Sequence, residues 1–153
     1  MKKYVFLFFF LFFSISFGFA FAEDCLISQI TTIRAGNLTF QLPAGFKKDT
    51  IMYRRQLDGY KFDSIQIQAY PKDSSFSDEQ TLSYLKETSS KIGEQSEEVN
   101  INGKNVLFQK SVSGASAYFC ENGMLYMIIY INMDNNDYNL AKSFIMNIIR
   151  TAR

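Results

Sequence analysis

The most apolar run in the body of the chain extends from Met124 to Met133, with the sequence MLYMIIYINM. Side chains of an extended strand alternate between two faces, so Leu125, Met127 and Ile129 point to one side and their neighbours to the other. Both faces are apolar, which is typical of a strand in the middle of a sheet that is covered on both sides. The isoleucines and tyrosines favour a strand over a buried helix, and a membrane span would need roughly 20 apolar residues. We therefore predict that this run is the central strand of the sheet.

Shorter alternations of apolar and polar residues before this run predict hairpins, because the segments flank turn sequences. The strongest turn signal is Asp58-Gly59, and a two-residue loop there places Arg54 opposite Asp63 and Met52 opposite Ile65. The predicted strand pairs are 30–34 with 38–42, 51–57 with 60–70, and 94–101 with 104–112 about Asn102-Gly103. A small-residue connection over 113–116 then leads to a strand over 117–120, which turns at 121–123 into the central strand.

Two helices are predicted, one between the hairpins and one near the end of the chain. Ser77 and Gln80 form a capping box, and Gly93 ends the first helix, whose inward stripe consists of Leu82, Leu85, Ser89 and Ile92. The second helix extends from about 137 to 149, is capped by oxygens from 135–137, and has a broad apolar face made of Leu140, Ala141, Phe144, Ile145, Ile148 and Ile149. This order predicts an α+β fold, an antiparallel sheet of hairpins covered by helices.

The first 22 residues have the pattern of a secretory signal peptide. Lys2 and Lys3 precede an unbroken apolar stretch, and Ala20-Phe21-Ala22 is a small-x-small cleavage site followed by acidic residues. We expect cleavage near Ala22, which leaves 23–153 as a single exported domain, periplasmic or extracellular, with no stable membrane anchor. An uncleaved N-terminal anchor is the alternative, because the segment approaches the length of a membrane span.

Both cysteines, Cys25 and Cys120, follow the expected cleavage site. In an oxidising compartment they form a disulfide in one interpretation, which stabilises the fold by about 4 kcal/mol on the chain-entropy model. In the other interpretation they stay apart, because Cys25 lies very close to the new N-terminus. Lipidation of Cys25 is disfavoured, because Asp24 occupies the position where a lipobox has a small residue.

The composition removes several kinds of functional site. The chain has no histidine, which excludes Ser-His-Asp and Cys-His catalysis and the usual zinc sites. A formal net charge of +1 gives no support for nucleic-acid binding. The segment 134–137 lacks the ligand pattern of an EF-hand, and Glu97 and Glu98 are interpreted as solvated charges on a strand edge. No metal or cofactor is expected.

The order of elements resembles a known fold family. The stretch Leu38 to Phe46, LTFQLPAGF, has an aromatic-x-Leu-Pro-x-Gly-aromatic opening, and a closing helix follows a strongly apolar strand. These features resemble the PsbP-like fold, shared by the PsbP subunit of photosystem II, a Ran-binding nuclear import factor and DcrB-like bacterial envelope proteins. The resemblance implies an antiparallel sheet between helical layers (an α/β/α sandwich) and a role in binding other proteins, with no catalytic motif.

One surface has the composition of a contact site. In the predicted register Tyr53, Arg55, Tyr60 and Phe62 share one face of a hairpin, and arginine among aromatic side chains is common at protein interfaces. The alternative is an ordinary amphipathic hairpin whose aromatic residues pack at the sheet edge. We predict an exported, non-enzymatic binding or accessory protein with an envelope protein as its partner, and the oligomeric state stays open. A histidine-free hydrolase that uses carboxylates or a lone serine, and a structural subunit of an envelope assembly, are the alternatives.

Overall fold

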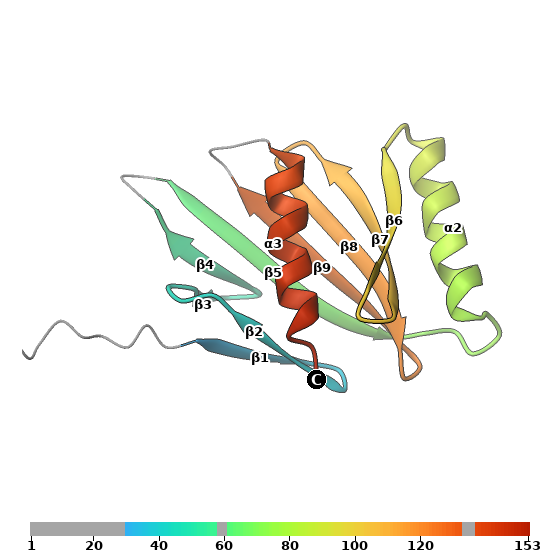
Figure 1. Ribbon diagram of the computed structural model, residues 1–153, viewed down its shortest axis with the longest axis horizontal. Helices are drawn as coiled ribbons and strands as arrows, with labels where there is room; N and C mark the ends of the chain where they lie inside the picture. The colour runs from blue at the N-terminus through green and yellow to red at the C-terminus, as the bar shows by residue number, and fades with distance from the viewer. Residues whose placement is uncertain (1–29, 58–60, 133–136) are drawn as a thin grey trace, which may run out of the picture.

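The structure is a computed structural model in which residues 30–57, 61–132 and 137–153 are described (Figure 1). The expected signal peptide, Cys25 and the hairpin residue Tyr60 lie outside the described residues. The strands are β1 (Thr31–Ala35), β2 (Leu38–Leu42), β3 (Lys47–Asp49), β4 (Met52–Gln56), β5 (Phe62–Pro71), β6 (Ser96–Ile101), β7 (Lys104–Ser111), β8 (Gly114–Glu121) and β9 (Met124–Asn132). The helices are α2 (Asp78–Lys91) and α3 (Tyr138–Arg150).

The apolar run forms β9, and it lies at the centre of the larger sheet as predicted. Seven antiparallel strands follow the order β3-β4-β5-β9-β8-β7-β6, and β9 is hydrogen-bonded to β5 on one side and to β8 on the other. The first hairpin, β1–β2, forms a separate two-stranded sheet. The chain therefore has the predicted α+β architecture, with hairpins as its building units.

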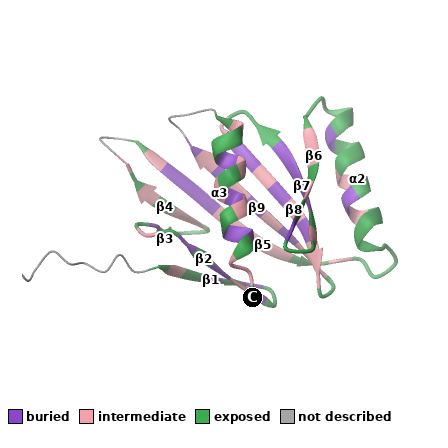
Figure 2. Cartoon of the chain, viewed as in Figure 1, coloured by how far each residue is buried: buried purple, intermediate pink, exposed green. Residues whose placement is uncertain are grey.

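The two faces of the seven-stranded sheet are covered to different extents. On one face, here the α3 face, α3 and the β1–β2 hairpin enclose the main core (Figure 1). On the opposite face, the α2 face, α2 packs on β8, β7 and β6, and Leu82 and Leu107 are buried there. Figure 2 shows that most of α2 stays exposed, whereas buried positions recur along α3 and the central strands. The largest buried side chains of the α3 face are Phe40, Phe108, Phe119, Tyr126, Ile128 and Ile145.

The Asn-Gly turn sequences form the tight loops that they predict. Asn102 and Gly103 have φ angles of 52° and 83° between β6 and β7. Asn122 and Gly123 have φ angles of 50° and 74° between β8 and β9. Positive φ at both central residues is the mark of a type I′ turn, whose twist suits antiparallel strands.

The predicted connection over 113–116 is wrong, because β8 already begins at Gly114. A Cβ at Gly114 would lie 2.0 Å from the carbonyl oxygen of Tyr130 on the neighbouring strand, so only glycine fits there. Ala115 and Ala117, which follow, are fully buried in the core of the α3 face. The small residues therefore allow close packing within a strand and do not mark a loop.

The register of the β4–β5 hairpin differs from the prediction by one residue. Arg55, and not Arg54, pairs with Asp63, and Tyr53, and not Met52, pairs with Ile65. The Leu57 amide donates to the Lys61 carbonyl oxygen at 2.9 Å, so three residues separate this hydrogen-bonded pair where the Asp58-Gly59 signal predicted two. A one-residue shift exchanges the two faces of a strand, and this decides which hairpin side chains meet.

The helix signals are largely confirmed. Ser77 and Gln80 form the capping box, and the Asp137 carboxylate accepts from the first turn of α3. Ala141, Ile145, Ile148 and Ile149 of α3 are buried, whereas Leu140 is 49% exposed. The inward stripe of α2 is confirmed at Leu82 and Ser89 but is wrong at Ile92, which is 69% exposed because it lies after the last helical turn.

Candidate functional site

The hairpin that was expected to carry a contact surface instead holds a buried ion pair. The Arg55 guanidinium lies 2.5 Å from the Asp63 carboxylate through Nη2 and Oδ2, and its Nε donates to Oδ1 at 3.2 Å. Asp63 is fully buried, and the Tyr130 hydroxyl donates to Oδ2 at 2.9 Å. Burial, followed by the hydrogen bond to Asp63, raises the pKa of Tyr130 to about 12. The hydroxyl therefore stays protonated and acts as a permanent donor to the carboxylate.

Aromatic rings enclose the same guanidinium. The Cζ of Arg55 lies 4.8 Å from the centroid of Phe46 and 5.8 Å from that of Phe144, within the range of cation–π attraction. Phe144 in turn stacks on Tyr130 with ring centroids 4.2 Å apart. Arg55 thus joins β4, β5, β9 and α3 at one end of the core, and its hydrogen-bonding groups face inward.

The structure divides the four predicted hairpin residues. Tyr53 and Arg55 lie on the α3 face, where Tyr53 packs against the core. Phe62 lies on the α2 face, where its ring is 5.1 Å from the Cζ of Arg54. The expectation that Phe62 shares a face with Arg55 is wrong, because it depended on the two-residue loop. Tyr60 lies outside the described residues.

The two glutamates of β6 are not simply solvated charges. The Lys142 Nζ lies 2.7 Å from Glu97, which also accepts a hydrogen bond of 2.7 Å from the Tyr138 hydroxyl. The hydrogen bond from Lys142, followed by that from Tyr138, lowers the pKa of Glu97. Burial, followed by the same bond to Glu97, raises the pKa of Tyr138. Glu98 points to the other face and pairs with Lys86 of α2 at 2.8 Å, so the two neighbours tie the edge strand to different helices.

Cys120 forms no disulfide with any described residue, and its proposed partner Cys25 lies outside them. Burial, followed by the charge of Asp78, raises the pKa of the Cys120 thiol to about 11. A thiol with such a pKa is almost entirely protonated at neutral pH, which makes it a weak nucleophile. Within the described ranges, no group of three or more cysteine, aspartate or glutamate residues is arranged to hold a metal ion.

The part of the α2 face that α2 leaves uncovered is the second candidate surface. It is formed by Gln66, Gln68 and Tyr70 of β5 and by Leu125, Met127 and Ile129 of β9, which pair directly with one another across the two strands. We call these six residues the open face. None of them is buried, although the alternate β9 residues Tyr126, Ile128 and Tyr130 on the other side of the strand are. No described helix packs on this strip.

The open face carries no charge. All six side chains are neutral, and Tyr70, the most exposed of them at 45%, donates its hydroxyl to Gln68 within the surface itself. Further aromatic side chains lie close by: Phe76 is 51% exposed and Tyr84 is 68% exposed. Exposed aromatic side chains beside half-buried aliphatic ones, as Leu125, Met127 and Ile129 are, are characteristic of a surface that another molecule covers.

A pocket adjoins one end of the open face. It has a volume of about 440 Å³ and is lined mainly by apolar groups of Pro71, Phe76, Thr81, Tyr84 and Leu125. Lys72 borders it, but its ammonium group is already paired with Asp78 at 3.1 Å and donates to the Phe76 carbonyl oxygen at 2.5 Å. Asp73 also lines the pocket, and its carboxylate accepts from the Ser75 amide at 2.9 Å and from the Ser75 hydroxyl at 2.7 Å. The pocket is therefore mainly apolar, and both of its charged side chains already have partners.

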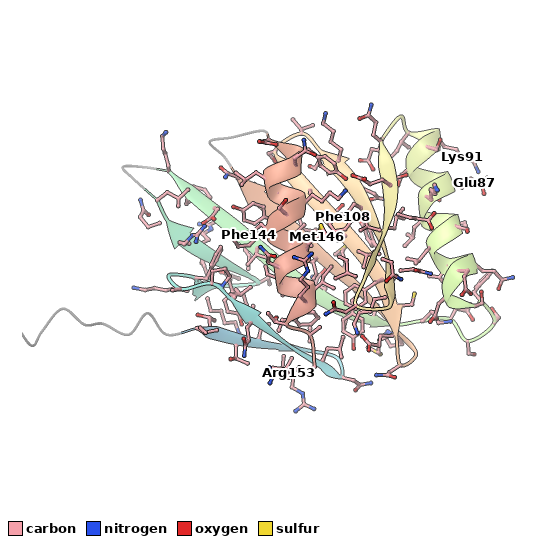
Figure 3. All side chains as sticks on the ribbon, in the orientation of Figure 1. Glu87, Lys91, Phe108, Phe144, Met146 and Arg153 are labelled. Atoms are coloured by element: carbon pink, nitrogen blue, oxygen red, sulfur yellow. The ribbon has the colours of Figure 1, made fainter. Side chains whose placement is uncertain are left out.

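The side of α2 that borders the open face also consists mainly of neutral side chains. Thr81 and Thr88 donate their hydroxyls to the carbonyl oxygens of Ser77 and Tyr84 in their own helix, at 2.9 and 2.8 Å. These hydroxyls therefore have partners within the helix. The charged pair Glu87–Lys91 lies on the outer side of α2, away from the sheet (Figure 3). The side of α2 that borders the open face thus consists mainly of neutral side chains, and Lys91, which interacts electrostatically with Tyr84, is paired with Glu87.

Sequence reasoning missed this surface because it assigned both faces of β9 to the interior. A signal was present on the neighbouring strand. Positions 66, 68 and 70 of β5 are Gln, Gln and Tyr, whereas positions 65, 67 and 69 are Ile, Ile and Ala. This alternation indicates one buried and one accessible face, and applied across the pairing it would have placed the odd-numbered residues of β9 on the accessible side.

Comparison with known proteins identifies the fold. The sequence matches no protein-family model and no curated protein. The structure is similar to the solution structure of cyanobacterial PsbP (CyanoP) from Synechocystis sp. PCC 6803, with a TM-score of 0.54 and 9% sequence identity. The match covers 89% of this chain and 98% of that chain. The PsbP-like fold implied by the opening motif and the order of elements is therefore confirmed, and at this identity the likeness concerns the fold alone.

None of the described helices combines the length and the apolar character that crossing a membrane requires.

Proposed function

We propose that this chain is an exported accessory protein that binds a partner protein of the cell envelope through the open face. The observation that carries the proposal is a strip of the central sheet, beside α2, whose apolar and aromatic side chains stay accessible and uncharged. A protein of this size usually covers such a strip with its own elements, as this chain does on the α3 face. The non-enzymatic role implied by the resemblance to PsbP-like proteins is consistent with this surface.

The hairpin contributes less to the proposed contact than its composition suggests. Arg55 and Tyr53 are engaged with the core of the α3 face, and replacing them would disturb the fold before it disturbed a partner. Phe62, held against Arg54 on the α2 face, lies on the same face as the open face and extends it toward β4. The centre of the proposed contact is accordingly β9 and not the hairpin tip.

Export is supported by the basic, apolar and small-x-small pattern of the first 22 residues. Intact mass spectrometry of protein from its native envelope tests it, and the mature chain should begin at Glu23. A species that retains Met1, or one that carries a diacylglyceryl group on Cys25, would refute the export of a free domain.

The contact surface is tested by photocross-linking in intact cells. A photoreactive amino acid placed at Met127 should give a discrete cross-linked product with a second protein. The same group at Gln41, an exposed residue of β2 on the other side of the molecule, is the matched control and should give none. Equal cross-linking from both positions, or none from Met127, would contradict the proposal.

A further inference from the structure

We propose that the open face receives an amphipathic α-helix of the partner. This helix lies beside α2 across β5 and β9 and inserts one apolar side chain into the pocket that is lined by Phe76 and Tyr84 at the end of the open face. This inference rests on the proposed function and adds the conformation and chemistry of the segment that binds.

The width of the surface fits one helix. Neighbouring strands are about 4.8 Å apart, so β5 and β9 together span about 10 Å. A helix with its side chains has a diameter of about 10–12 Å. Since α2 already covers β6, β7 and β8, a single additional helix beside it covers the next two strands of the sheet, β9 and β5.

The length of the surface fits as well. The row from Leu125 to Ile131 on β9 extends for about 20 Å at roughly 3.4 Å per residue. This corresponds to about 14 residues of helix at 1.5 Å per residue. The helix that covers the neighbouring strands, α2, has 14 residues.

The backbone of β9 favours a helical partner over an extended one. β9 is hydrogen-bonded along its length to β5 and to β8, so it offers no free backbone donor or acceptor. An extended peptide bound flat on the open face would leave its own backbone groups without hydrogen-bond partners, at a cost in free energy. A helix satisfies its backbone internally and presents only side chains. The outer edge of β5 beyond Ile65, which no described strand pairs, is where an extended segment would bind instead.

The residues expected on the binding helix follow from the uncharged side chains of the open face and of the adjacent side of α2. A charged residue on the contacting face would lose its hydration without gaining a partner, because neither the open face nor Thr81, Tyr84 and Thr88 carry a charge. The contacting face must therefore be apolar, with residues at i, i+3, i+4 and i+7. The pocket of about 440 Å³ accommodates one large anchor such as phenylalanine, leucine or methionine. Lys72 is paired with Asp78 and Asp73 is hydrogen-bonded to Ser75, so neither lining charge favours a charged anchor.

Two peptide libraries displayed on phage test this inference against the mature chain. Both contain peptides of about 18 residues, one with apolar positions at helical spacing and one with the same composition in strict alternation. We expect binders from the helical library whose helical circular dichroism increases on binding and whose binding is abolished by a proline at a central position. Binders only from the alternating library, or none from either, would overturn the proposal.

Point variants locate the binding site. Gln66→Glu places a charge on the open face, and Tyr84→Ala removes one side of the pocket; each should weaken binding of a selected peptide at least about tenfold. Gln41→Glu on β2 and Glu87→Ala on the outer side of α2 are the matched controls and should leave affinity unchanged. Peptides that bind all four variants equally would place the site elsewhere and overturn the inference.

The failure of this inference is distinguishable from that of the proposed function. Photocross-linking from Met127 reports any protein partner on the open face, whatever its conformation, whereas the libraries report the conformation. Sedimentation of the mature chain covers the remaining occupant: a dimer that Gln66→Glu dissociates would mean that a second copy covers the face, which overturns the inference.

Discussion

The two sides of β9 give a direct measure of how far the open face is covered. Ile128 and Ile129 are adjacent, chemically identical and in the same central strand, but Ile128 is fully buried under α3 whereas Ile129 is only partly buried. Truncation of a fully buried isoleucine to alanine removes its transfer free energy and leaves a cavity, which together cost about 2–5 kcal/mol. We expect Ile128→Ala to lie in the upper half of this range, because its surroundings are filled by large side chains such as Phe119 and Tyr126.

Ile129→Ala should cost less. Part of its side chain already contacts water, and solvent can fill the space that truncation leaves, so no closed cavity results. We expect a loss of about 1–2 kcal/mol, no more than half of that at Ile128.

Urea unfolding of the mature chain and both variants measures these losses, and an unchanged m-value confirms that the unfolding transition is comparable. Equal losses at the two sites would mean that the open face is covered in the isolated protein, and the proposed binding surface would then be refuted.

Three further outcomes are expected. Asp63→Asn should lower the free energy of unfolding in urea by about 3 kcal/mol, which is the lower end of the range for a broken buried ion pair, because Arg55 is 29% exposed. A loss below about 1 kcal/mol would contradict a stabilising role for the Arg55–Asp63 pair. Glu97→Gln should reduce the loss of stability that acid causes. The pKa of Glu97 is lower in the folded state, so the stability that its carboxylate contributes is complete above about pH 4.5 and is lost as the pH falls through the pKa of the folded state. Parallel plots of stability against pH for the variant and the parent chain would contradict this prediction. The Cys120 thiol should react with iodoacetamide in proportion to a thiolate with a pKa of about 11, and a rate that levels off near pH 8 would exclude the buried thiol.

The sequence predicts the frame of the sheet because several independent signals agree. The run from Met124 is apolar on both faces and too short for a membrane span, and the Asn-Gly pairs at 102–103 and 122–123 supply the positive φ angles that tight hairpins need. The capping box at Ser77 fixes the start of α2 through two local hydrogen bonds of 2.8 and 3.1 Å. Each of these features depends on neighbours within a few residues, which is why a single sequence is sufficient to predict them.

Features that depend on pairing or contact with another segment, and not on the local residue pattern, are harder to predict. β3 has the sequence Lys-Lys-Asp with all three side chains exposed, and it forms a strand only because β4 lies beside it. The one-residue shift of the β4–β5 register is stabilised by Asp63, whose carboxylate needs both Arg55 and the Tyr130 hydroxyl from another strand. In the predicted register Arg54 would stand opposite Asp63, and Arg55, whose guanidinium lies against Phe46 and Phe144, would point to the other face. The observed register is the one in which the arginine opposite Asp63 also contacts Phe46, which lies outside the hairpin, so tertiary contacts and not the local turn signal accompany it.

The open face shows why apolar composition alone does not locate an interface. Apolar residues are expected at the odd-numbered positions of β9 whether a helix of this chain or a helix of another protein covers them, because either helix would bury the same kind of surface. The difference lies in the number of elements available: α2 is 14 residues long and one helix wide, and it lies over β6, β7 and β8. A helix is only about two to three strands wide, so α2 covers fewer than half of the strands of the seven-stranded sheet. The strip over β5 and β9 remains apolar and is not covered by any described helix of this chain. We therefore propose that a partner protein covers it.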